Sequence, residues 1–188
     1  YPVEGWTYED FLEDVDALTK YMGQPAYAVC GSGGDTGNYF WSTVVTNGGE
    51  LVDESGKVQF NNEIGVAAVR QVLDLYDNGY LRSSFVESTM DDALVAFINQ
   101  EVALGYGNAS WWMDIEASPI GMNYGTVTHP VGSAGLTVGV VTLSEFGVMS
   151  YTKNPEAALT VLSYLASPES IIRSNSILGW IPYRLDLM

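Results

Sequence analysis

The chain has 188 residues, of which 47% are hydrophobic and 12% aromatic, so it can bury a sizeable core and is not intrinsically disordered. Its 23 acidic and 7 basic residues give a formal net charge of −16. A surface of that sign repels phosphate backbones and anionic lipid heads, which argues against nucleic acid and membrane surfaces as partners. The habitat of the organism is an equally good explanation of the acidic composition.

Two residue types limit the chemistry. Cys30 is the only cysteine and His129 the only histidine. A single cysteine excludes an intrachain disulfide and a Cys-based metal site, and one imidazole followed by Pro130 is a poor basis for a catalytic triad. We therefore expect His129 to be structural or merely exposed, and we predict no metal site and no cofactor.

The chain carries no obvious membrane or export signal. No apolar run approaches the ~18 residues that a bilayer span requires. The first residues, 1–6, lack the basic and apolar regions of a signal peptide. We expect the chain to begin after processing or inside a longer protein.

Helix start signals recur along the chain. Thr7 to Asp10 has the form of a capping box, an apolar stripe from Phe11 to Met22 follows, and Gly23 is a suitable stop. Further helices are predicted from Asn38 to Thr46, from Asn62 to near Gly79, from Ser88 or Asp91 through Ile98, and after Asn154-Pro155-Glu156 and Ser167-Pro168-Glu169.

Shorter segments are typical of strands and turns. A small hairpin is predicted around Glu54-Ser55-Gly56, and strands are predicted at 124–129, 138–141 and 146–149. The glycine-rich segment 31–37 has neither a following lysine nor the GxGxxG spacing. It is therefore a weak phosphate-site candidate, and we interpret it as a mobile loop.

The most informative segment lies at the middle of the chain. An amphipathic helix from Met90 to Gln100 is followed by a short buried strand, 101–106, and then by a glycine loop, 107–110, that ends in Trp111 and Trp112. A loop after a strand that presents large flat side chains is a natural place to hold a small molecule. Because the two tryptophans are adjacent, we expect at least one of them to be a core residue.

The order of several motifs resembles the extracellular solute-binding proteins of ABC importers, in the carbohydrate-binding group that includes maltose-binding protein. The resemblance covers nearly the whole chain, and each motif alone is weak. The motifs are a helix start, a Gly-Gly segment with a hairpin, a helix–strand–Gly–x–Trp block and two carboxyl-terminal blocks: Trp6 to Phe11, Asn47 to Val58, Ala96 to Trp111, Lys153 to Ala158 and Gly179 to Pro182.

The resemblance implies an α/β, periplasmic-binding-protein-like type II fold. The first lobe of the family is absent before Tyr1, and helices usual after its Ile-Pro segment are missing after Met188. We therefore expect this chain to be a fragment, mostly the helix-rich carboxyl-terminal lobe with a small mixed sheet. We expect residues 1–135 to belong to that lobe, 136–166 to form a crossover to the amino-terminal lobe, and 167–188 to return.

The implied function is to bind an extracellular solute, most plausibly a mono- or oligosaccharide, and to deliver it to an ABC permease. A sugar ring binds well with an aromatic plane beneath its C–H face and polar groups at its edge. The resemblance assigns ligand contacts to the following residues: Trp111, Trp41, Tyr39, Asn38, Asp35 and Trp180. It makes Trp111 the platform on which the ligand stacks, so that Trp112 is the expected core residue. It further implies a monomeric protein outside the cytoplasm, either periplasmic or held by a lipid anchor, with no enzymatic activity.

Two other classes remain open at this point. Twenty-three acidic residues supply many candidate carboxylate pairs for a carbohydrate-active enzyme. An aromatic-rich module that binds other proteins is the second alternative. Oligosaccharide turnover would favour the enzyme, whereas tight binding of a free sugar would argue against the interaction module.

Overall fold

The computed structural model describes residues 2–33, 36–141 and 146–187. The chain forms two compact units. Unit 1 comprises residues 1–107 and 118–140, and unit 2 comprises residues 108–117 and 141–188. Asp35, a predicted ligand residue, lies outside the described residues.

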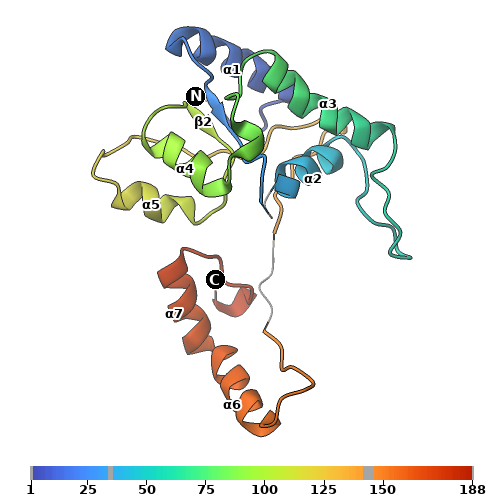
Figure 1. The fold of residues 1–188 in the computed structure, drawn as a ribbon, viewed down its shortest axis with the longest axis vertical. Coiled ribbons are helices and arrows are strands. Elements are labelled where there is room, and N and C mark those ends of the chain that lie inside the picture. The colour runs from blue at the N-terminus through green and yellow to red at the C-terminus, as the bar shows by residue number, and fades with distance from the viewer. Residues whose placement is uncertain (1, 34–35, 142–145, 188) are drawn as a thin grey trace. The chain divides into compact units, whose positions relative to one another are not determined.

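Unit 1 is built mainly from four helices, α1 (Tyr8–Met22), α2 (Thr36–Thr46), α3 (Glu63–Asp77) and α4 (Met90–Ile98), with a short 3-10 turn η1 (Phe85–Glu87) (Figure 1). The capping box at Thr7 and the stop at Gly23 are confirmed: Thr7 Oγ1 accepts from the Asp10 amide, and Gly23 adopts the left-handed conformation with φ 66°. The Asn62 cap of α3 is confirmed as well.

The start of α4 differs from our expectation by one residue. Thr89, and neither Ser88 nor Asp91, is the N-cap, and Asp92 completes a reciprocal capping box with it. Thr89 and Asp92 have the three-residue spacing that such a box needs, and this pairing satisfies two amides at once.

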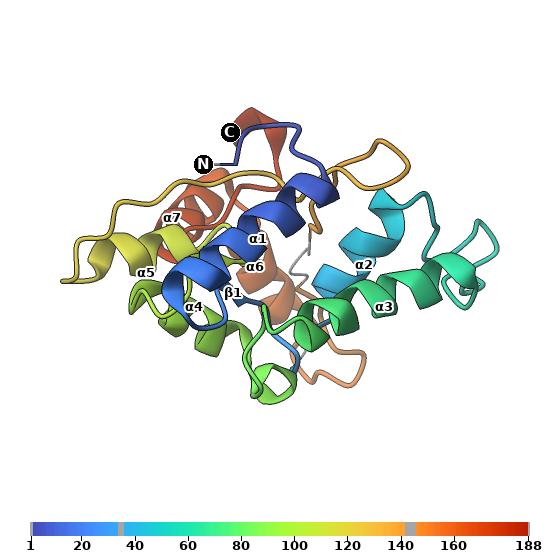
Figure 2. The same cartoon turned by 90° about the horizontal axis from the view of Figure 1, so that it is seen from above.

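A small sheet lies beside α4. Strands β1 (Tyr27–Ala28) and β2 (Leu104–Gly105) are parallel, with Tyr27 opposite Leu104. The described residues thus show a parallel pair where we expected a mixed sheet, and the antiparallel bridge, Val52 with Val58, lies in the predicted hairpin outside it. Helices α2 and α3 lie side by side in both views (Figures 1 and 2).

The core of unit 1 is largely aromatic. The Phe11 ring meets the Tyr27 ring edge-on with centroids 5.1 Å apart, and Val15 and Leu75 are fully buried beside them. The apolar face of α1 and the strand β1 therefore build the same core.

The strand predictions for 124–129, 138–141 and 146–149 are wrong. None of these described segments pairs into a ladder. The segment around Thr128 and Val131 is instead held by isolated hydrogen bonds. Trp6 Nε1 donates to the Thr128 carbonyl at 2.9 Å, and Val131 forms one isolated parallel bridge with Thr7, in which its amide donates to the Trp6 carbonyl at 2.8 Å. Alternating residues favour an extended backbone, but a strand also needs a neighbour with free backbone groups.

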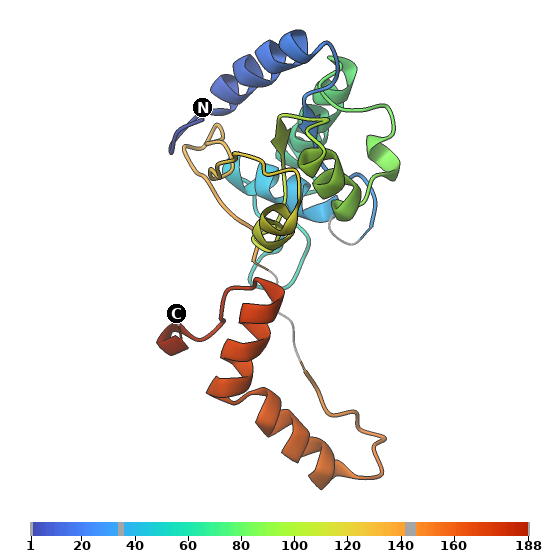
Figure 3. The same ribbon diagram turned by 90° about the vertical axis from the view of Figure 1, so that its left-hand side faces the viewer.

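Unit 2 contains α5 (Trp111–Ala117), α6 (Pro155–Leu165), α7 (Pro168–Leu178) and the 3-10 turn η2 (Leu185–Leu187). Helix α6 leads into α7 through Ala166 and Ser167 (Figure 3). None of the residues of α6 is buried, although the helix carries Leu159, Val161 and Tyr164. Nowhere among the described residues is a helix both long and apolar enough to cross a membrane.

Candidate functional site

Unit 2 contains a hollow of about 640 Å³ between α5, α7 and the segment that follows α7. Its walls are mainly apolar and aromatic, and the lining residues are Ala109, Trp112, Ile172, Asn175, Ser176, Gly179, Trp180, Ile181, Pro182 and Leu187. The volume lies in the ordinary range of small-molecule sites. We take this hollow as the candidate site.

The first wall is set by how α5 begins. Asn108 Oδ1 accepts hydrogen bonds from the Ser110 amide at 3.1 Å and from Ser110 Oγ at 2.6 Å. This local turn starts the helix at Trp111, so the two tryptophans stand on a helix and not on the predicted loop. Successive helical residues point about 100° apart, which lets the two indoles have different surroundings.

The two indoles are buried to very different extents. Trp111 is only 8% exposed, whereas Trp112 is 49% exposed and lines the hollow. This contradicts our expectation that Trp112 is the core residue. The ligand contact expected of Trp111 stays a prediction.

The second wall comes from α7 and from the turn after it. Ile172, Asn175, Ser176 and Gly179 have the i, i+3, i+4, i+7 spacing of one helix face. Gly179 ends the helix in the left-handed conformation, and the Asn175 carbonyl accepts from the amides of both Gly179 and Trp180. The tight turn directs the chain so that Trp180, 49% exposed, lines the same hollow.

The polar groups of the hollow are uncharged. Ser176 Oγ donates to the Ile172 carbonyl at 2.8 Å, which leaves its lone pairs free to accept. The side-chain amide of Asn175 makes no hydrogen bond to any described residue and can both donate and accept. Next to Leu187, the charges of Arg184 and Asp186 pair with each other at 2.6 Å, and this hydrogen bond holds the pKa of Asp186 below its usual value.

The predicted residues of α2 lie in unit 1. Tyr39 is buried in the core, where its ring contacts Tyr27, Tyr106 and His129, and burial raises its pKa well above the usual value. Asn38 and Trp41 are half-buried. The structure thus groups Asn38, Tyr39 and Trp41 on one helix of unit 1 and places Trp111 and Trp180 in unit 2.

His129 occupies a structural position, as the sequence led us to expect. Its ring contacts those of Tyr39 and Tyr106 at centroid distances of 5.5 and 6.0 Å. Nδ1 lies 3.1 Å from the Pro130 carbonyl, while Nε2 is buried with no hydrogen-bond partner among the described residues. Burial lowers the pKa of His129 and so favours the neutral ring.

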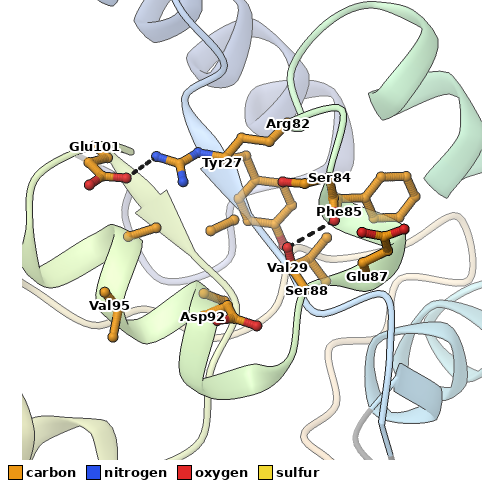
Figure 4. A pocket seen from close by; sticks show the side chains of 13 residues that line it. Tyr27, Val29, Arg82, Ser84, Phe85, Glu87, Ser88, Asp92, Val95 and Glu101 are labelled. Atoms are coloured by element: carbon orange, nitrogen blue, oxygen red, sulfur yellow. Dashed lines mark hydrogen bonds and ion pairs between the residues drawn. The ribbon is translucent and has the colours of Figure 1, made fainter.

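A second hollow, of about 360 Å³, lies in unit 1 between β1, α4 and the segment around η1 (Figure 4). Here three of the four charged side chains, Arg82, Glu101 and Asp92, already have partners, whereas the Glu87 carboxylate has none among the described residues. Arg82 pairs with Glu101, which keeps the pKa of that carboxyl low, and Asp92 is bound to Thr89 in the capping box. These polar groups would have to exchange existing partners to bind a ligand, unlike the amide of Asn175 in unit 2.

Of the residues that line the hollow, Trp180 was predicted from the sequence as a ligand residue, which stays a prediction, whereas Asn175, Ser176 and Trp112 were not predicted. The helical spacing from Ile172 to Gly179 was readable in the sequence and is the signal that could have identified the polar wall. The exposure of Trp112 had no such signal, because it depends on where α5 begins.

Comparison with known proteins identifies the family. The model of the bacterial extracellular solute-binding proteins matches residues 1–171. The chain belongs to this family. No curated protein sequence matches the solute-binding chain.

Solved structures share its fold. The maltose-bound MalE3 of T. maritima superposes with a TM-score of 0.80 at 22% identity, covering 100% of this chain and 49% of that one. A solute-binding protein of Thermotoga lettingae bound with α-D-tagatose gives 0.74 at 21% identity, covering 98% and 48%. One from Agrobacterium radiobacter in complex with ribitol gives 0.69 at 19% identity, covering 99% and 49%. This solute-binding chain therefore has a periplasmic-binding-protein-like fold and spans about half the length of these similar proteins.

Proposed function

We propose that the protein containing this chain binds an uncharged sugar or polyol and that the hollow of unit 2 forms part of the binding site. The observation that carries the proposal is the pair of half-exposed tryptophans, Trp112 and Trp180, on one hollow whose polar side chains are Asn175 and Ser176. Indole faces suit the C–H face of a sugar ring, and an amide and a hydroxyl suit its edge. The similar proteins crystallised with maltose, tagatose and ribitol support the same ligand class.

The absence of charge in this lining supports a neutral ligand. A charged solute would leave water without gaining a charged partner from any of the ten lining residues. The overall negative charge of the chain adds a repulsive field for anions. We therefore expect uronic acids and sugar phosphates to bind far more weakly than neutral sugars.

The direct test is a titration of the intact protein. Maltose, D-tagatose and ribitol are added in turn while tryptophan fluorescence is recorded, and heats of binding are measured in parallel. We expect saturable 1:1 binding of at least one of them with a change in fluorescence. If none of these sugars, and no member of a wider neutral-glycan panel, binds at millimolar concentration, the proposal is wrong.

We also infer that the protein has no glycosidase activity. Among the described residues, no aspartate or glutamate lines the hollow, so none of them supplies the acid and the base or nucleophile of such an enzyme there. Oligosaccharides incubated with the protein should be recovered unchanged by chromatography, and the appearance of shorter products would contradict this inference.

We propose that the bound sugar is delivered to the transmembrane permease of an ABC importer. Family membership supports this partner and a place outside the cytoplasm, and it leads us to expect a monomer that is either free in the periplasm or held by a lipid anchor. Ligand in such a protein would be enclosed by closure of two lobes, and the closed form would be the one that the permease recognises.

The lobe assignment is also a proposal: residues 1–135 in the carboxyl-terminal lobe, 136–166 as a crossover to the amino-terminal lobe, and 167–188 as the return. The bare apolar surface of α6 supports it, since Leu159 and Val161 are more than half exposed in this chain. Similar proteins have about twice this length, enough polypeptide to cover such a helix. Asn38, Tyr39, Trp41, Asp35 and Trp111 remain our candidates for further ligand contacts.

A further inference from the structure

Gly179 lies where the two walls of the hollow touch. A Cβ atom built on this glycine would lie 2.5 Å from Met113 Sδ, 2.8 Å from Met113 Cγ and 3.2 Å from Trp112 Nε1. Unbonded heavy atoms prefer separations near 3.5–4.0 Å, so a side chain at residue 179 would require Met113, Trp112 or the backbone to move.

The contact at Gly179 lies between the two elements that carry the tryptophans of the hollow. Trp112 stands on α5, while Trp180 is the residue directly after Gly179, and both line the same space. Any group added at position 179 would press on Met113 and on the indole nitrogen edge of Trp112. A side chain at position 179 would therefore meet the wall of the hollow that carries Trp112.

The left-handed backbone conformation alone does not distinguish Gly179 from another glycine that ends a helix. Gly23 ends α1 with φ 66° and ψ 19°, nearly the same as φ 66° and ψ 24° at Gly179. Each donates its amide to the carbonyl four residues earlier. Yet nothing lies within 4 Å of a Cβ built at Gly23. The two glycines share the backbone demand and differ only in what surrounds them.

We propose that Gly179 is a positioning residue for solute binding: it lets α7 pack directly against Trp112 and Met113 and so sets Trp112 beside Trp180. The inference rests on the proposed function, because it concerns the same hollow. Stacking on an aromatic plane depends on its placement, so a displaced Trp112 lowers affinity even in a folded protein.

The test compares Gly179→Ala with Gly23→Ala in the intact protein. Both variants place an L-residue at a left-handed C-cap and carry the same backbone cost. We expect Gly179→Ala to weaken binding of the best of maltose, D-tagatose and ribitol by about tenfold or more, the scale on which a central aromatic contact contributes. Gly23→Ala should bind as tightly as the wild type.

Two further measurements separate positioning from folding. The indole Nε1–H signal of Trp112, assigned with Trp112→Phe, is followed by NMR in the ligand-free protein, where we expect Gly179→Ala to shift it and Gly23→Ala to leave it unchanged. Adding Met113→Ala to Gly179→Ala removes the atoms nearest the new methyl group and should restore most of the affinity.

The possible outcomes separate a failure of the Gly179 proposal from a failure of the proposed function. If Gly179→Ala binds sugar as well as Gly23→Ala does, or shifts the Trp112 signal no further, Gly179 does not position Trp112 for binding and the proposal is wrong. If the wild type binds no sugar, the proposed function fails separately, and the Trp112 signal still tests the contact without any ligand.

Discussion

Unit 1 and unit 2 differ in how much of their apolar surface they bury. Nineteen of the twenty-two buried hydrophobic residues among the described residues belong to unit 1, and only Trp111, Ile115 and Ile171 belong to unit 2. Unit 2 nevertheless exposes large side chains on α6, on α7 and beyond, including Leu159, Ile177 and Trp180. Unit 1 therefore has a core of its own, whereas unit 2 presents surfaces suited to contacts with something else.

The charges, in contrast, are divided roughly in proportion to the size of the units. Unit 1, with 130 residues, contains seventeen acidic and four basic residues, a net charge of −13, and unit 2, with 58 residues, contains six acidic and three basic residues, a net charge of −3. Both units are therefore acidic, and the burial of apolar side chains distinguishes them more clearly than charge does.

The largest predicted effects are those of substituting the two adjacent tryptophans. Trp111→Ala should destabilise the protein by about 3–5 kcal/mol because it opens a cavity at a buried side chain. Trp112→Ala should leave stability nearly unchanged but weaken sugar binding about tenfold or more. Urea unfolding and sugar titration of both variants provide the measurement.

A reversed result would be informative. If Trp111→Ala lost affinity with intact stability, as the family resemblance by itself implies, then Trp111 would be the platform. Trp112 would then be an incidental surface residue.

The next effect compares two leucines. Leu75 is fully buried in unit 1 and Leu159 is 54% exposed in unit 2. In this chain Leu75→Ala should cost about 2–5 kcal/mol of unfolding free energy, whereas Leu159→Ala should change it by less than about 0.5 kcal/mol.

The same two substitutions test the lobe assignment when they are made in the intact protein. There, Leu159→Ala should become clearly more costly if, as the lobe assignment requires, the rest of the protein covers α6. An equally small effect in both would show that α6 faces solvent and would remove the support for residues 136–166 as a crossover.

The smallest effect concerns pH and the one histidine of unit 1. The folded pKa of His129 lies below the ordinary value of 6.5 because the ring is buried, so the unfolded chain takes up this proton first as pH falls. Stability should therefore decrease below about pH 6.5, by at most about 1.4 kcal/mol per pH unit for one proton.

The other groups with shifted pKa values are not expected to bind or release protons between pH 5 and 7.5. Tyr39 and Tyr106 have pKa values raised by burial, and the carboxyls with shifted pKa values, such as Asp10 and Asp92, are shifted downward. Urea unfolding between pH 7.5 and 5 should thus show a decrease that His129→Gln abolishes. A decrease that persists in His129→Gln would exclude the histidine as its source.

Local signals predicted much of the helical framework. The boxes and caps at Thr7, Asn62 and Ser167 are interactions within three residues, so the sequence contains both partners. The extended segment near Thr128 was misassigned as a strand because its neighbour, Trp6, is more than a hundred residues away. The site was only partly predictable for the same reason.

Local patterns were enough to predict where helices start, and composition was enough to show the acidic charge and the single histidine and cysteine. The order of the motifs indicated the solute-binding family. Only the tertiary structure decided which of the tryptophans of the central Gly107-to-Trp112 segment faces a hollow. That choice depends on the helix beginning at Trp111 and on Gly179 approaching Met113 and Trp112 from a distant part of the chain. Burial is a property of what packs against a residue, and no local pattern contains that partner.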